Sequence, residues 1–263
     1  MERDQADFKE VLADAQKLGY AEANPSLDID GFDTAHKATI AASLAYGNWF
    51  GMDPVYVEGI TEITLDEIKL TNELGYKIKL LAIIKQDEGN VEIRVHPTLI
   101  PKQSMLAKVD DVFNAVMVNG DFVGDTMFYG RGAGRNATAS AVVADITDVC
   151  LNLTAGSSRR IPGFVAGNLY NKVLPIDNVK SRYYLSLQVA DEPGVLARIT
   201  NILAAWNISI SSVVQKERKG EENVSLVILS HLSEEKSMKA AISEINALAE
   251  VRNNVKFIRI EDL

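Results

Sequence analysis

The segment Tyr183-Tyr184-Leu185-Ser186-Leu187-Gln188-Val189-Ala190-Asp191-Glu192-Pro193-Gly194-Val195-Leu196 decides the fold of the last third of the chain. Its first seven residues are rich in aromatic and branched side chains and predict a β-strand. Pro193 restricts the backbone of the turn that follows. Beyond the turn, apolar residues recur at helical spacing and would share one face of a helix: Val195, Ile199, Ile202 and Leu203. The segment therefore predicts a strand, a turn and an amphipathic helix in succession.

The residues after this helix predict four more elements. They are strands over 208–215 and 224–230, a helix that begins near Ser233, and a strand over 255–260. The resulting order, β-α-β-β-α-β, is that of the ferredoxin-like split motif. We therefore expect residues 181–263 to form a ferredoxin-like domain.

The first half of the chain has a different order of elements. Helices are predicted over 6–18, 33–46, 65–74 and 138–153, and strands over 55–60, 77–84, 91–95 and 112–118, with a glycine-rich loop over 129–135. Residues 1–155 are expected to form one domain, and 156–180, which contain glycine, serine and proline, a linker. The predicted class is α+β, with helices packed on a mainly antiparallel or mixed sheet, followed by the ferredoxin-like unit.

Composition narrows the classes of function. A net charge of −9 with three histidines argues against nucleic acid as a partner, because phosphate binding requires a basic surface. No apolar run approaches the ~20 residues that span a bilayer, and the first residues lack the apolar core of a signal peptide. The single cysteine, Cys150, favours a reducing compartment, and we expect a buried structural thiol there. The sequence predicts a cytoplasmic protein without a membrane partner or a metal site.

The segment from Gly19 to Lys37 carries the clearest candidate chemistry. Asp33 and Lys37 lie four residues apart and would share one face of a helix, while Glu22 and Asp28 precede that helix. A lysine held beside carboxylates can keep or exchange a proton near a reacting oxygen. The alternative is a solvated ion pair that contributes about 0.2–0.5 kcal/mol to helix stability.

Four stretches of the first half resemble the homoserine dehydrogenase family. They are Gly19-Tyr20-Ala21-Glu22 with Asp28, Gly31, Asp33 and Lys37; Val95-His96-Pro97-Thr98-Leu99-Ile100-Pro101; Asn114-Ala115-Val116; and the run from Gly130-Arg131-Gly132-Ala133-Gly134-Arg135 to Asp145. Several matches in the same order over this length are more specific than any one of them alone.

The resemblance implies a reaction and a set of roles. The reaction is the NAD(P)-dependent interconversion of L-aspartate 4-semialdehyde and L-homoserine, on the route to threonine and methionine. Lys37 would donate and accept the proton, Asp33 would orient it, Glu22 would bind the substrate ammonium and Asp28 would assist in binding substrate. The cofactor would be contacted by the loop residues Gly132, Ala133 and Gly134.

The C-terminal unit resembles an ACT domain, a regulatory module that usually works in pairs. The resemblance rests on Asp191, Pro193, Gly194, Val195 and Leu196, and it implies an amino-acid effector at this turn, with threonine as the candidate, and a homodimer or homotetramer. A helix start offers backbone N–H groups to a carboxylate. The alternative is a capped turn that binds no ligand.

Family members begin with a dinucleotide-binding domain, and no strand followed by a Gly-x-Gly-x-x-Gly turn lies near the start of this sequence. We expect the chain to be a truncated gene product, a piece of a longer protein or one subunit of a split enzyme. The alternative function is therefore a catalytically silent, dimeric, amino-acid-sensing fragment. The preference between NAD and NADP stays open, as do the effector and the sign of its regulation.

Overall fold

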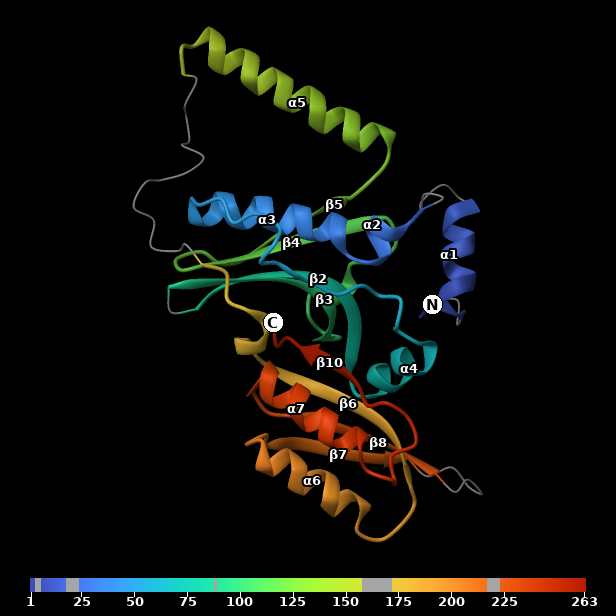
Figure 1. Cartoon of the computed structure of the whole chain (residues 1–263). Coiled ribbons are helices and arrows are strands. Elements are labelled where there is room, and N and C mark those ends of the chain that lie inside the picture. The colour runs from blue at the N-terminus through green and yellow to red at the C-terminus, as the bar shows by residue number, and fades with distance from the viewer. Residues whose placement is uncertain (3–5, 18–23, 88, 158–171, 217–222) are drawn as a thin grey trace.

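A computed structural model describes residues 1–2, 6–17, 24–87, 89–157, 172–216 and 223–263, and it has the expected α+β class (Figure 1). The helices are α1 Phe8–Lys17, α2 Ser26–Ile29, α3 Phe32–Tyr46, α4 Leu65–Glu73, α5 Arg135–Thr154, α6 Val195–Ala205 and α7 Glu235–Asn246, with 3-10 turns η1 Leu106–Lys108 and η2 Ile176–Asn178. The strands are β1 Tyr56–Val57, β2 Tyr76–Asp87, β3 Asn90–Pro101, β4 Phe113–Gly120, β5 Gly124–Arg131, β6 Lys180–Ala190, β7 Ile210–Lys216, β8 Asn223–Ser230, β9 Ser233–Glu234 and β10 Lys256–Ile260.

One sheet runs through both halves of the chain. Its strand order is β1-β3-β10-β6-β8-β7, with β2 paired to β3 and β9 paired to β6. The halves join where β10 pairs in parallel with β3, at Arg259 opposite Thr98 and Ile260 opposite Leu99. The β1–β3 pair is also parallel and the remaining pairs of this sheet are antiparallel, so the sheet is mixed, as predicted.

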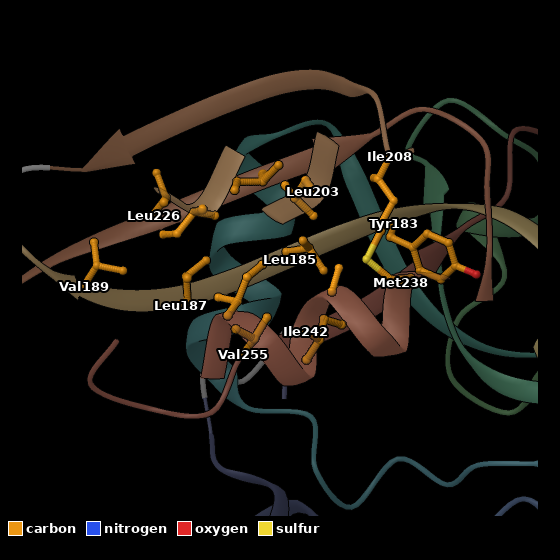
Figure 2. Close-up of a cluster of buried hydrophobic side chains, with 14 of the residues drawn as sticks. Tyr183, Leu185, Leu187, Val189, Leu203, Ile208, Leu226, Met238, Ile242 and Val255 are labelled. Carbon is orange, nitrogen blue, oxygen red and sulfur yellow. The ribbon is translucent and has the colours of Figure 1, made fainter. Parts of the chain in front are cut away.

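The C-terminal unit has the predicted ferredoxin-like order, and the alternation of residues along β6 explains its core. Tyr183, Leu185, Leu187 and Val189 point to the side covered by α6 and α7, because successive side chains of a strand face opposite sides of a sheet. Figure 2 shows Leu185 and Leu187 facing Met238 and Ile242 of α7. Tyr184 faces the other way, into a second cluster that includes Leu99 of β3 and Ile78 of β2.

In the N-terminal half, α3 lies on the β2–β3 hairpin. The helix presents a face of small residues to the strands, which lets its backbone approach them closely: Ala35, Ala38, Thr39, Ala42 and Ser43 are all buried. Gly31 begins this helix in a left-handed conformation with φ +85°, which favours glycine. The buried face leaves Asp33 and Lys37 on the outer side of α3.

The segment from β4 to α5 departs from the predictions in two ways. The glycine-rich loop was expected to begin at Tyr129, but β5 continues through Arg131, where the ring of Tyr129 stacks on Phe113 with 4.8 Å between ring centres. Cys150 was expected to be buried, and it is exposed. The reason is that α5 extends away from the rest of the chain and has no buried residue (Figure 1).

Candidate active site

The Asp33–Lys37 pair forms as the sequence predicted. Lys37 Nζ lies 2.5 Å from Asp33 Oδ2, and the side chains are 64% and 44% exposed respectively. An exposed ion pair of this kind contributes little to stability. Asp33 also lies in the first turn of α3, where the helix dipole favours a negative charge. The geometry thus places an accessible ammonium group beside a carboxylate that orients it.

The backbone before α3 is fixed against the sheet by two glycines. A Cβ atom on Gly31 would lie 3.3 Å from methyl groups of Val57 and Val95. A Cβ atom on Gly59 would lie 2.4 Å from the carbonyl oxygen of Ile29, a separation that real Cβ atoms do not show. The Ile60 N–H also donates to that oxygen at 2.8 Å. This close packing fixes the position from which α3 starts, and therefore that of Asp33 and Lys37.

The predicted substrate-binding residues precede α3. Asp28 lies on α2 with an exposed side chain, one turn before Asp33. Glu22 lies outside the described residues, so the structure does not place it relative to Lys37. His36, next to Lys37, is exposed, and His96 is buried on β3.

The predicted cofactor loop lies between β5 and α5. Gly132, Ala133 and Gly134 are exposed, and Gly134 begins α5 with φ +116° and no side-chain cap. An uncapped helix start leaves backbone N–H groups for an anion, so this loop fits a phosphate of a dinucleotide. A hollow of about 320 Å³ lies beside it, lined by Asn114, Ala115, Val116, Phe128, Tyr129, Gly130, Arg131 and Gly132. Among the described residues, no hydrogen bond or ion pair joins this loop to Asp33 or Lys37.

The predicted effector turn separates into exposed and buried residues. Asp191, Pro193 and Leu196 are exposed, and Gly194 begins α6 with φ +91°. Val195 is different, because its side chain is buried in the core beneath α6 and its N–H bonds to the Glu192 carbonyl. The turn can therefore present backbone and exposed side chains to a ligand, but not the side chain of Val195.

A network of arginine and glutamate side chains connects the two halves, and it was not predicted from the sequence. Arg259 of β10 bonds to Glu235 of α7 and to Glu58, which directly follows β1. Arg94 of β3 bonds to Glu261 just after β10. One signal was available: Glu92, Arg94 and His96 alternate along β3, and three polar side chains on one face of an apolar strand indicate a partner network.

Burial and the charge of Arg259 shift the pKa values of two side chains that contact it, Tyr56 and Glu235. Burial raises the pKa of Tyr56 to about 12, although Arg259 acts in the opposite direction. Burial alone would raise the pKa of Glu235, but the hydrogen bonds and charge of Arg259 hold that pKa below its ordinary value. Glu235 is therefore a carboxylate that stays charged beside a buried guanidinium.

Comparison with known proteins identifies both halves. A family model described as homoserine dehydrogenase matches residues 1–147, and the ACT domain model matches residues 183–250. The homoserine dehydrogenase of Neisseria gonorrhoeae is 45% identical over 259 residues, which cover 97% of this chain and 60% of that protein. The crystal structure of a homoserine dehydrogenase from Thiobacillus denitrificans matches with a TM-score of 0.93 and 46% identity, over 100% of this chain and 60% of the other.

More distant relatives agree. The S. aureus homoserine dehydrogenase at pH 7.5 matches with a TM-score of 0.73 and 33% identity, again over 100% of this chain and 61% of the other. The chain thus spans about 60% of the length of the relatives it matches. Both resemblances drawn from the sequence are confirmed. The chain belongs to the homoserine dehydrogenase family and carries an ACT domain in its C-terminal unit.

Proposed function

We propose that the chain provides the substrate half of a homoserine dehydrogenase, an oxidoreductase that interconverts L-aspartate 4-semialdehyde and L-homoserine. The reaction serves threonine and methionine biosynthesis. The observation that carries the proposal is the Asp33–Lys37 pair, accessible at the start of a helix whose position is fixed by Gly31 and Gly59. A fixed backbone holds the Lys37 ammonium in one position, and its exposure lets a small polar substrate reach it.

In this mechanism Lys37 handles the proton at the oxygen of the substrate. As the aldehyde is reduced, negative charge develops on that oxygen, and the Lys37 ammonium donates a proton to it. In the reverse direction the neutral amine takes the proton back from the hydroxyl group. Asp33 holds the ammonium in place through its hydrogen bond, and Asp28 and Glu22 attract the ammonium group of the substrate.

NAD(P) supplies the hydride acceptor and donor when it is bound. The loop Gly132-Ala133-Gly134 would contact the cofactor, and the uncapped start of α5 suits a phosphate group there.

We retain residues 1–155 as the substrate and dimerisation domain, 156–180 as the linker and 181–263 as the ACT regulatory domain. The turn from Asp191 to Leu196 would bind an amino-acid effector, with threonine as the candidate, in a cytoplasmic enzyme.

We further propose that the chain forms a homodimer through α5 and the β4–β5 hairpin. This surface is apolar and uncovered in the single chain: Val116, Phe128, Val142, Ile146, Val149 and Leu153 are each more than half exposed. Exposed apolar side chains gathered on one helix and one hairpin are typical of a protein–protein interface. A second copy of the chain would cover it, and a homotetramer would need a further contact.

The catalytic role of Lys37 predicts the outcome of an activity assay. The purified chain is given aspartate 4-semialdehyde with NADPH or NADH, and nicotinamide absorbance is followed. Lys37→Ala should lower kcat by about two to four orders of magnitude, because general acid–base catalysis contributes that much, while circular dichroism stays unchanged. His36→Ala, a change at the neighbouring exposed residue, is the matched control and should keep full activity.

Wild-type turnover in Lys37→Ala would remove Lys37 from the mechanism. Absence of turnover in the wild-type chain would instead favour a silent, amino-acid-sensing fragment or a subunit that needs a separate nucleotide-binding partner. Threonine binding by calorimetry and copurification of a second polypeptide would then separate these two.

A further inference from the structure

Arg259 holds together elements from both halves of the chain. Its side chain is 1% exposed. The guanidinium donates to both carboxylate oxygens of Glu235 at the start of α7, from Nη2 to Oε1 at 2.5 Å and from Nε to Oε2 at 2.9 Å. The remaining nitrogen, Nη1, donates to Glu58 Oε2 at 2.8 Å. Nη2 also lies 3.1 Å from the hydroxyl of Tyr56 on β1. A single buried cation therefore connects the ACT domain to the strand beside the candidate active site.

The connection continues from Glu58 to the residues that place α3. The Glu58 N–H donates to the carbonyl of Val95 at 2.8 Å, which holds this segment on β3. The next two residues, Gly59 and Ile60, contact the backbone of Ile29 by close approach and by a 2.8 Å hydrogen bond. Glu58, Gly59 and Ile60 form what we call the anchor segment. It lies between Arg259 and the turn that leads into Asp33.

We propose that Arg259 is a positioning residue that couples the ACT domain to the candidate active site through the anchor segment. The proposal rests on the proposed function, since Asp33 and Lys37 are the groups that it positions. A guanidinium is a rigid planar fork, so it cannot follow two carboxylates that move apart. A displacement of the start of α7 must therefore be shared with Glu58 or break one of the two contacts.

The two contacts differ in strength, and this difference determines which one responds. Glu235 is fully buried and accepts two hydrogen bonds from Arg259 and one from Tyr183. The side chain of Glu58 is 38% exposed and accepts one from Arg259 and one from the Tyr56 hydroxyl. Solvent weakens the second ion pair more than the first. The Glu58 contact is the one that opens when α7 moves. Loss of that contact releases the anchor segment and, with it, the backbone before Asp33.

Hydrogen exchange of the purified chain tests the coupling without requiring catalysis. Glu58→Ala removes the weaker contact and leaves the Arg259–Glu235 pair inside the C-terminal unit, which avoids the misfolding risk of a change at Arg259. We expect exchange to be about tenfold faster or more at the amides of Ile60, Asp30 and Gly31, because Glu58→Ala removes the hydrogen bonds that Arg259 and Tyr56 donate to this carboxylate. Glu62→Ala, which removes an exposed carboxylate from the same loop, should change nothing.

A purely structural role would give a different pattern. In that case exchange in Glu58→Ala would rise equally along β6 and β8, and this result would overturn the proposal, as would unchanged exchange at Ile60. Glu58→Gln keeps a hydrogen-bond acceptor and should restore most of the protection. In the activity assay, Glu58→Ala should lower kcat and raise KM together, because the released backbone carries Asp28 as well as Asp33 and Lys37, and Glu58→Gln should restore both.

Failure of the coupling and failure of the proposed function give separate signatures. A wild-type chain without turnover, both alone and with a copurified nucleotide-binding polypeptide, would contradict the proposed function and leave the exchange result standing. Turnover in the wild type, with wild-type exchange and wild-type kcat in Glu58→Ala, would contradict the coupling alone.

Discussion

His96 is a buried imidazole whose partners fix its protonation. Nε2 lies 2.7 Å from Arg94 Nη1, and Nδ1 lies 3.0 Å from the carbonyl oxygen of Pro97. Because a guanidinium can only donate, Nε2 must accept and Nδ1 must carry the proton. Burial, with Arg259 and Arg94 acting in the same direction, holds the pKa of His96 well below its ordinary value. The folded chain therefore keeps a neutral histidine here.

This residue predicts a loss of stability in mild acid. Below about pH 6.5 the unfolded chain binds a proton at His96 and the folded chain does not, so stability is present above that pH and is lost as the pH falls. The expected loss from this one group is about 1.4 kcal/mol between pH 7.5 and pH 5.5. Urea unfolding at the two pH values measures it. His96→Gln should lose less stability over this interval than the wild type, and the exposed His36→Gln should behave like the wild type.

Identical pH dependence in the wild type and His96→Gln would contradict a neutral His96. The alternation along β3 places Arg94 on the same face as His96, whereas Arg259, the other arginine that lowers its pKa, lies far away along the chain. Asp33 and Lys37 were predictable because one helical turn separates them. The long-range partners of Arg259 and Arg94 were not, because Glu58 and Glu261 lie 201 and 167 residues away along the chain.

Most elements follow from local patterns, and α5 shows where such patterns stop. The glycine-rich loop and the apolar residues that follow it predicted helix α5. The sequence of α5 does not indicate which part of the protein, or which partner, packs against the helix. The apolar stripe of α5 consists of Val142, Ile146, Val149 and Leu153, which recur at helical spacing and are 52–67% exposed. The hairpin strand β5 was missed because tertiary pairing with β4 extends it to Arg131, into residues with loop-like composition.

The stripe predicts which substitution disrupts the proposed homodimer. Ile146→Glu places a charge in the middle of the apolar surface and should convert the dimer to monomer, because an unpaired carboxylate at an interface centre is strongly unfavourable. Light scattering coupled to size-exclusion chromatography measures the mass. Ala144→Glu adds the same charge on the opposite side of the helix and should leave the dimer intact. A dimer that persists in Ile146→Glu, or a wild-type monomer, would place the contact elsewhere or exclude it.

The two units are joined more closely than the sequence indicated. A linker over 156–180 suggested separate domains, but β10 pairs with β3 and one apolar cluster combines Leu99 with Tyr184 and Ile258. Parallel pairing between strands so distant along the chain leaves no local signal, because register is set by tertiary packing. Among the described helices, none is long and apolar enough to cross a bilayer.

A shared sheet predicts that both halves unfold together. Glu261 binds Arg94 at 2.5 Å and also contacts Lys85, all at the junction of β10 with β3. Glu261→Ala removes one of the two carboxylates that pair with the buried Arg94 and leaves Glu92 as the other, so it should destabilise the chain by about 1.5–3 kcal/mol. If the chain is one cooperative unit, native-state hydrogen exchange in low urea should show this loss equally for the most protected amides of β3 and of β6.

Asp262→Ala, at the next residue, removes a carboxylate that is 55% exposed and paired with Arg182. It should cost no more than about 1 kcal/mol, because the pair lies in solvent. If β6 and β8 keep their protection in Glu261→Ala while β2 and β3 lose theirs, the halves are energetically independent. In that case the parallel contact between β3 and β10 would add little to stability. Equal losses would instead mean that the ACT domain and the N-terminal half form one folding unit, so that a ligand bound to either must stabilise both.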